Sequence, residues 1–308
     1  MLSSFFSKSK PIHLAIICFL LTLVFVLVKM PYFSENSSSL NWYGKQIVLL
    51  GLSLFTLFVL DFLASRNKLT KKNSYKLLFF ALCVIAIPKS LLNSDILVAN
   101  VFLLLAIRRL VSLRSQKQIM KKLFDASFWI CVASLFYFWA ILFIALVFAA
   151  LFLFKINIPK YWLIPFTAVI TVLILFTCYA LIFNMDLVSY FEEKLVYSFN
   201  FTGIGSKRTM FALSLMLAYY VWGLFFYFGK ISQVSRSLKA PFYLIFLSSV
   251  IAILLTILVP NKTGGEWLFF FTPFAIIITN YLEEITEKWF KESLILVFLV
   301  VPFLALLL

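Results

Sequence analysis

Charged residues are scarce in this sequence, and their scarcity excludes a soluble globular fold. Only 13% of the 308 residues are charged and 64% are hydrophobic, whereas soluble domains have roughly 25% and about 45–50%. Long apolar runs recur from Ile12 to Leu308, and no polar segment is long enough for a soluble domain of about 100 residues. We therefore expect a single integral membrane domain that comprises residues 1–308.

Histidine and cysteine are also sparse, and neither supports a metal centre. The single histidine, His13, begins the first apolar run, where we interpret it as an interfacial residue. The cysteines all lie within apolar segments at spacings that match no zinc motif: Cys18, Cys83, Cys131 and Cys178. The sequence also lacks a nucleotide-binding loop and the motifs H-E-x-x-H and G-x-S-x-G. We expect no metal, no cofactor and no ATP hydrolysis by this chain.

Acidic residues are few, and the chain is strongly basic. It has 12 Asp and Glu against 27 Lys and Arg, a net charge of +15. The basic residues are dispersed among short loops between apolar runs, so we do not expect nucleic acid as a partner. Loops of this kind are typical of the cytoplasmic side of a membrane protein, and they also attract anionic membrane lipid.

The apolar runs predict several membrane-spanning helices, each of which needs about 20 residues. The clear candidates lie near residues 12–28, 46–64, 161–183, 209–228, 241–259, 267–282 and 293–308. No small-residue cleavage site follows the first run, so we interpret it as a retained helix rather than a signal peptide. Two stretches are ambiguous: 77–107 is interrupted by PKSLLNSD, and 126–154 carries no charge.

Helix length and charge both indicate that 126–154 crosses the membrane twice. A single helix of that length would be roughly 44 Å long and would need a tilt above the usual limit of about 40°. With hairpins at 77–107 and 126–154, loops on the N-terminal side hold 20 basic residues and the other loops seven; a single crossing at 126–154 gives 17 and 10. We predict an all-α, polytopic bundle of about 11 helices including two short hairpins, with a cytoplasmic N-terminus and an external C-terminus.

The loops on the predicted outer face contain the candidate site residues. They are segments 31–45, 89–95, 184–208 and 260–267, and their acidic and basic candidates are Glu35, Asp95, Lys207, Arg208, Lys262 and Glu266. We expect Lys207, Arg208, Lys262 and Glu266 as contacts to substrate.

Two of these loops have alternative interpretations. Apolar residues recur every three or four positions over 187–199, which predicts an amphipathic helix in the membrane interface. That helix either joins two spans or forms a lid over a lipid headgroup, with Lys207 and Arg208 contacting phosphate. Glu266 opens a helix, where the helix dipole favours a carboxylate; a functional alternative is an acceptor for sugar hydroxyls or a base.

Three segments resemble an uncharacterised family of polytopic inner-membrane proteins from Flavobacterium-like Bacteroidota. They are MLSSFFSKSKPIHL at the start, RRLVSLRSQKQIMKKLFDASFWICVASLFYFWAILF in the middle and GGEWLFFFTPFAIIITNYLE near the end. The resemblance covers essentially the whole chain. It implies a multi-pass protein of the bacterial inner membrane and carries no established activity.

A more distant similarity is to membrane glycosyltransferases of the C-type fold, which use polyprenyl-phosphate sugars as donors. It rests on the order of features: a first helix, an outer loop with an acid, pairs of short helices, and the segment from Lys121 to Phe138 leading into an outward hairpin. In that family an acid in the first outer loop is a base or metal ligand, and a second acid follows in the next outer loop. The resemblance implies these roles for Glu35 and Asp95.

Three functions remain open at this point. The first is glycosyl transfer at the outer face, with a carboxylate deprotonating the acceptor and a basic side chain stabilising the leaving phosphate. The second is a transporter or flippase for a lipid-linked substrate. The third is a non-catalytic subunit that assembles with other envelope proteins. Membrane lipid is an expected partner in each case.

Overall fold

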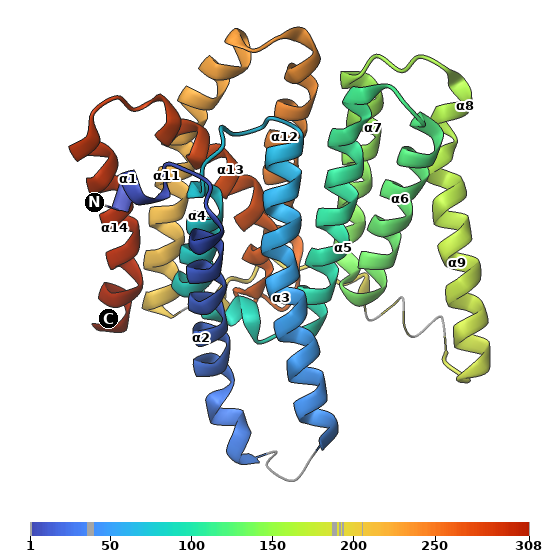
Figure 1. Ribbon diagram of the computed structural model, residues 1–308. Coiled ribbons are helices and arrows are strands. Elements are labelled where there is room, and N and C mark those ends of the chain that lie inside the picture. The colour runs from blue at the N-terminus through green and yellow to red at the C-terminus, as the bar shows by residue number, and fades with distance from the viewer. Residues whose placement is uncertain are drawn as a thin grey trace.

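The protein is described by a computed structural model that covers residues 2–35, 40–186, 190, 192, 194–204 and 206–307 (Figure 1). Within these residues it is helical and contains no strand, which confirms the all-α prediction. The α-helices are α1 (Leu2–Phe6), α2 (Pro11–Glu35), α3 (Leu40–Arg66), α4 (Tyr75–Ala86), α5 (Ser94–Val111), α6 (Ile119–Phe136), α7 (Ile144–Leu153), α8 (Pro159–Trp162), α9 (Ile164–Ile182), α11 (Lys207–Gln233), α12 (Arg236–Leu258), α13 (Leu268–Glu284) and α14 (Lys288–Leu307). Short 3-10 helices are η1 (Pro88–Leu91), η2 (Ser112–Ser115), η3 (Phe138–Phe143), η4 (Thr202–Ile204) and η5 (Gly265–Trp267).

Successive long helices from α2 to α14 alternate in direction, so the connecting segments lie at two ends of the bundle (Figure 1). We call one end the basic end; it contains residues 7–10, 67–74, 112–118, 154–158, 234–235 and 285–287. The opposite end contains residues 87–93, 137, 183–186, 194–204 and 259–267. Six helices of the described chain are long and apolar enough to cross a membrane, as expected for a membrane protein.

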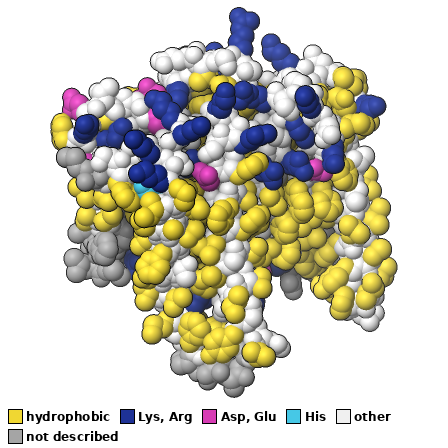
Figure 2. Space-filling model, in the orientation of Figure 1, with side chains coloured by type: hydrophobic (Ala, Val, Ile, Leu, Met, Phe, Trp, Pro, Cys, Tyr) yellow, Lys and Arg dark blue, Asp and Glu magenta, His cyan; other side chains and the backbone are white. Residues whose placement is uncertain are grey.

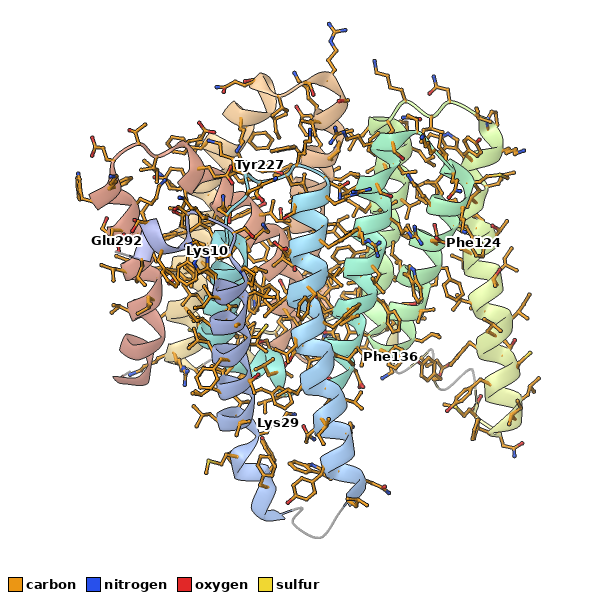
Figure 3. All side chains as sticks on the ribbon, viewed as in Figure 1. Lys10, Lys29, Phe124, Phe136, Tyr227 and Glu292 are labelled. Atoms are coloured by element: carbon orange, nitrogen blue, oxygen red, sulfur yellow. The ribbon has the colours of Figure 1, made fainter. Side chains whose placement is uncertain are left out.

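Both ambiguous stretches fold as hairpins. Helix α6 ends at Phe136, and Tyr137 is extended, with φ −134° and ψ 97°. The chain then turns through η3 and returns as α7; Figure 3 labels Phe124, in the first half of α6, and Phe136, its last residue. The other stretch breaks at η1, between α4 and α5. The two halves of each stretch therefore run in opposite directions, as the sequence predicts.

Helix α13 is the centre of the bundle. Every residue from Leu268 to Leu282 is buried, and the helix packs against α4, α5, α11 and α12. Aromatic rings make many of the contacts: Phe270 lies 5.0 Å from Tyr220 and Phe274 lies 5.8 Å from Phe298, measured between ring centroids. Lipid is as apolar as these side chains, so close packing rather than exclusion of water stabilises such a core.

Polar side chains tie the loops of the basic end to the helices. Glu283, at the end of α13, accepts hydrogen bonds of 2.7 Å from the backbone N–H of Lys71 and from Asn73 Nδ2, and it pairs with Lys230 at 2.7 Å. The fully buried Lys76 pairs with Asp61 at 3.0 Å. These carboxylates therefore hold loop 67–74 against the bundle.

Charged and hydrophobic side chains occupy different parts of the surface. Figure 2 shows Lys and Arg side chains gathered over the upper part of the visible face, at the basic end, with hydrophobic side chains covering the helices below. Large apolar side chains are exposed along these helices, for example Phe19 on α2, Ile47 on α3 and Leu181 on α9. This arrangement is that of a helical bundle with a lipid-facing wall.

The hairpin formed by α6 and α7 predicts the result of cysteine labelling. In a chain whose own cysteines are replaced by alanine, Lys121→Cys and Lys160→Cys will react with a membrane-impermeant maleimide from the same side, because both positions lie at the basic end. Lys45→Cys, at the start of α3, is the control and will react from the other side only. Labelling of positions 121 and 160 from different sides would contradict the hairpin.

Candidate functional site

Irregular segments meet at the opposite end, where α4 stops and α13 begins. Segment η1 packs on η5, and a hydrogen bond from Ser198 N to Leu258 O places the segment before η4 beside the end of α12. With 12 residues α4 is only about 18 Å long, so η1 lies well short of the ends of α2 and α3 (Figure 1). Irregular backbone at such a depth needs surrounding protein or a wet cavity.

Glu266 shapes the turn between α12 and α13. Its side chain is 2% exposed and accepts three hydrogen bonds: from Thr263 N at 3.0 Å, from Thr263 Oγ1 at 2.9 Å and from Gly264 N at 2.8 Å. Gly264 has φ +90°, a conformation that favours glycine. The carboxylate therefore accepts hydrogen bonds from its own turn, and for that reason it is poorly placed to accept a proton from a substrate.

Lys262 fastens the neighbouring segment. Its ammonium donates hydrogen bonds to the carbonyl oxygens of Ser198 and Val259 and lies 4.6 Å from the ring centroid of Phe201. A Cβ added at Gly203 would collide with the carbonyl oxygen of Lys262, so the two segments approach as closely as glycine allows. Burial lowers the pKa of Lys262, and the nearby Glu266 acts in the opposite direction.

These contacts correct part of the predicted interfacial helix over 187–199. Residues 187–189, 191 and 193 lie outside the described chain; Tyr190, Glu192 and Lys194 are helical as expected, whereas 195–200 is irregular. The physical reason is the pairing of Ser198 with both Leu258 and Lys262, which holds this backbone against the end of α12. The apolar periodicity there does not correspond to a helix.

A pocket of about 520 Å³ opens at this junction. Its lining residues are Lys89, Leu92, Asn93, Gly203, Lys262 and Thr263. Asn93 caps α5 by accepting hydrogen bonds from Asp95 N at 2.8 Å and Ile96 N at 3.3 Å. Within the described residues the ammonium of Lys89 has no hydrogen-bond or ion-pair partner and no carboxylate lines the pocket. The pocket is therefore suited to a negatively charged group.

Asp95, Lys207 and Arg208 do not line this pocket. Asp95 is exposed in the first turn of α5, where its carboxylate accepts a hydrogen bond from Ser94 Oγ at 3.3 Å. Lys207 is exposed and Arg208 is half-buried at the start of α11. The side chain of Glu35 lies outside the described residues. Of the six candidates, the structure brings together Lys262 and Glu266.

Four buried donors at or next to this end have no acceptor within the described chain: Tyr137 Oη, Trp139 Nε1, Arg208 Nε and Trp267 Nε1. Buried donors of this kind are unfavourable unless water or a ligand oxygen accepts from them. The described residues also contain no group of three His, Cys, Asp or Glu side chains that would hold a metal ion. The chemistry of this end is thus that of hydrogen-bond donors and ammonium groups.

Sequence reasoning missed Lys89 and Asn93 as pocket residues. Both belong to the predicted outer loop 89–95, in which the sequence singled out Asp95 as the candidate site residue. A signal was present, since Asn-Ser-Asp is a favourable start for a helix and fixes where α5 begins. The contact between η1 and η5 joins segments that are far apart in the sequence, and no local pattern indicates it.

The fold and this site define an α-helical bundle of the membrane-protein type, with six described helices long and apolar enough to cross a membrane and a cationic pocket at one end. The chain belongs to the family of unknown function DUF6427, whose family model matches residues 1–306. No curated protein matches the chain. No solved structure matches it. The resemblance to C-type-fold glycosyltransferases therefore stays a prediction. So does the origin in Flavobacterium-like Bacteroidota.

The hydrogen bonds of Glu266 predict a structural role for its carboxylate. Glu266→Ala will lower the free energy of unfolding by about 3 kcal/mol, because buried N–H groups of the turn lose a charged acceptor. The measurement is circular dichroism during unfolding in mixed micelles of dodecyl maltoside and sodium dodecyl sulfate. Glu287→Ala, at an exposed position, is the control and will change the value by less than about 0.5 kcal/mol. Equal stability of the two variants would contradict the assignment.

Proposed function

We propose that the chain is a multi-pass protein of the bacterial inner membrane with its N-terminus in the cytoplasm and its C-terminus outside. The support is the separation of charge in Figure 2, because Lys and Arg accumulate in cytoplasmic loops. The basic end then faces the cytoplasm. The pocket at η1 and η5 opens toward the outer leaflet.

The function we propose is binding of a lipid-linked phosphate, such as a polyprenyl-phosphate sugar, at this pocket. The observation that carries the proposal is the unpartnered ammonium of Lys89 in a pocket without a carboxylate, at a depth set by the short helix α4. Ionisable groups at such depth are rare and are functional by default. A phosphate would pair with Lys89 while its hydrocarbon chain stays in the bilayer.

A non-catalytic role fits this site better than glycosyl transfer. A glycosyltransferase of the predicted kind needs a carboxylate free to accept a proton from the acceptor hydroxyl. Glu266 is occupied by three hydrogen bonds, which favours a subunit that holds a lipid-linked ligand for an envelope-assembly complex.

One observation supports catalysis as the second candidate. Asp95 is exposed and lies two residues from Asn93, which lines the pocket. In that alternative Asp95 is the base, and Lys89 or Lys262 stabilises the leaving phosphate.

The proposed binding predicts a selective effect of Lys89. Lys89→Gln will weaken the binding of undecaprenyl phosphate about tenfold, because one charge-assisted contact to phosphate is lost. Binding is measured by native mass spectrometry of the purified full chain in detergent. The control is Lys45→Gln, which removes an exposed lysine at the same end outside the pocket and will leave the affinity unchanged. No binding to the unaltered chain, or an equal loss in both variants, would contradict the proposal.

Asp95→Asn separates the two candidate functions. If the chain only binds its ligand, this variant will restore the glycan content of envelope polymers in a deletion strain as fully as the unaltered chain does. A loss of glycan, with binding of undecaprenyl phosphate retained, would establish catalysis instead.

A further inference from the structure

We infer that the basic end contains a second site, which binds an anionic lipid carrying two phosphate groups, between α3 and α5. Two adjoining pockets of about 660 Å³ each form it. Phe62, Arg66 and Arg108 line both pockets and therefore mark the junction between them. One pocket is basic and takes the headgroup, and the other is an apolar groove that takes hydrocarbon.

The headgroup pocket concentrates positive charge. Its basic lining residues are Arg66, Lys68, Arg108, Arg109, Arg114 and Lys122, and no Asp or Glu lines it. They come from α3, α5, η2, α6 and the segment after α3, so the fold gathers them from three regions of the sequence. Basic pockets between membrane helices are typical binding places for lipid headgroups with several phosphates.

Most of this charge is not neutralised by the protein. Arg109 pairs with Asp125 at 3.1 Å, and Asp61, which lines the groove, is already paired with Lys76 at 3.0 Å. For the other five basic residues of the pocket, no carboxylate of the described chain lies within 4.0 Å. A ligand with one negative charge would leave most of the positive charge of the pocket unneutralised. A ligand with two phosphate groups neutralises more of it.

Two of the unneutralised side chains are held in position by hydrogen bonds to neutral oxygen atoms of the protein. Lys122 donates hydrogen bonds to Ser112 O at 2.7 Å and to Ser115 Oγ at 2.6 Å, and Arg114 donates to Asn67 O at 3.3 Å. Neutral acceptors hold these groups in place without removing their charge. The pocket is thus preorganised for an anion, which lowers the entropy lost on binding.

The apolar groove runs along one face of α3. Phe55, Phe58, Val59 and Phe62 are spaced by three and four residues and line it together. The three phenylalanines are between 44% and 49% exposed, so the groove is open to the bilayer. The guanidinium of Arg108 lies 4.4 Å from the ring centroid of Phe62, where the groove meets the headgroup pocket. This continuity favours a lipid over a free phosphate.

The test is native mass spectrometry of the full chain, purified in dodecyl maltoside, with added cardiolipin or phosphatidylglycerol. The unaltered chain will retain cardiolipin, which has two phosphates, in preference to phosphatidylglycerol, which has one. Arg66→Gln/Arg108→Gln will raise the cardiolipin concentration at half-saturation by about tenfold or more, because two charge-assisted contacts are lost.

Lys155→Gln/Lys160→Gln is the matched control. It removes the same charge from exposed residues at the same end that do not line either pocket, and it will change the half-saturation concentration less than about twofold. An equal loss in the two double variants would overturn the site, because it would show a diffuse attraction of the whole face. Failure of the unaltered chain to prefer cardiolipin would overturn the two-phosphate ligand.

A second arm separates a lipid from a free anion and guards against misfolding. Phe58→Ser will weaken cardiolipin binding and leave pyrophosphate binding unchanged, because it alters only the groove. Pyrophosphate binding as tight as cardiolipin binding would overturn the lipid assignment. If gel filtration shows that Arg66→Gln/Arg108→Gln does not fold, the exposed Lys68→Gln replaces it, and unchanged cardiolipin binding by that variant would then count against the site.

Discussion

Two carboxylates, one at each end of the buried helix α13, fix the turn that begins the helix and the contacts that tie its other end to the bundle. Glu266 accepts from the backbone of the turn before the helix, and Glu283 accepts from loop 67–74 and from Lys230. Apolar packing alone is nearly indifferent to sliding of one helix along another in lipid, because hydrocarbon surrounds every helix. The directional contacts of Glu283 with loop 67–74 and with Lys230 fix the height of α13. The hydrogen bonds of Glu266 fix the shape of the turn through which η5 meets η1.

The two proposed sites follow from that arrangement. At one end, the turn held by Glu266 brings Thr263 beside Lys89 and leaves a pocket with a free ammonium. At the other end, Asp61, Asp125 and Glu283 are paired with Lys76, Arg109 and Lys230, so Arg66, Arg108 and Arg114 have no carboxylate partner within the described chain. A shortage of acids thus determines where positive charge is left available for ligands.

Much of the fold could be predicted from the sequence, because helix length and charge act locally. The hairpin at 126–154 follows from its length and from the lysines that flank it, and the break at PKSLLNSD marks η1. The contacts across the bundle could not be predicted in this way. Proximity in sequence suggests Arg66 as the partner of Asp61, but the structure pairs Asp61 with Lys76, which enters from the next helix. The pocket at Lys89 likewise depends on two turns far apart in the chain.

The unequal lengths of the helices have a consequence for the surrounding bilayer. Helix α3, with 27 residues, is about 40 Å long, whereas α6, with 18 residues, is about 27 Å long. Hydrophobic mismatch depends on the apolar part of a helix, and in α3 that part begins after Lys45 and Gln46. The first turns of α3 and the end of α2 therefore project past the ends of the shorter helices, and the bilayer can keep its thickness around them (Figure 1).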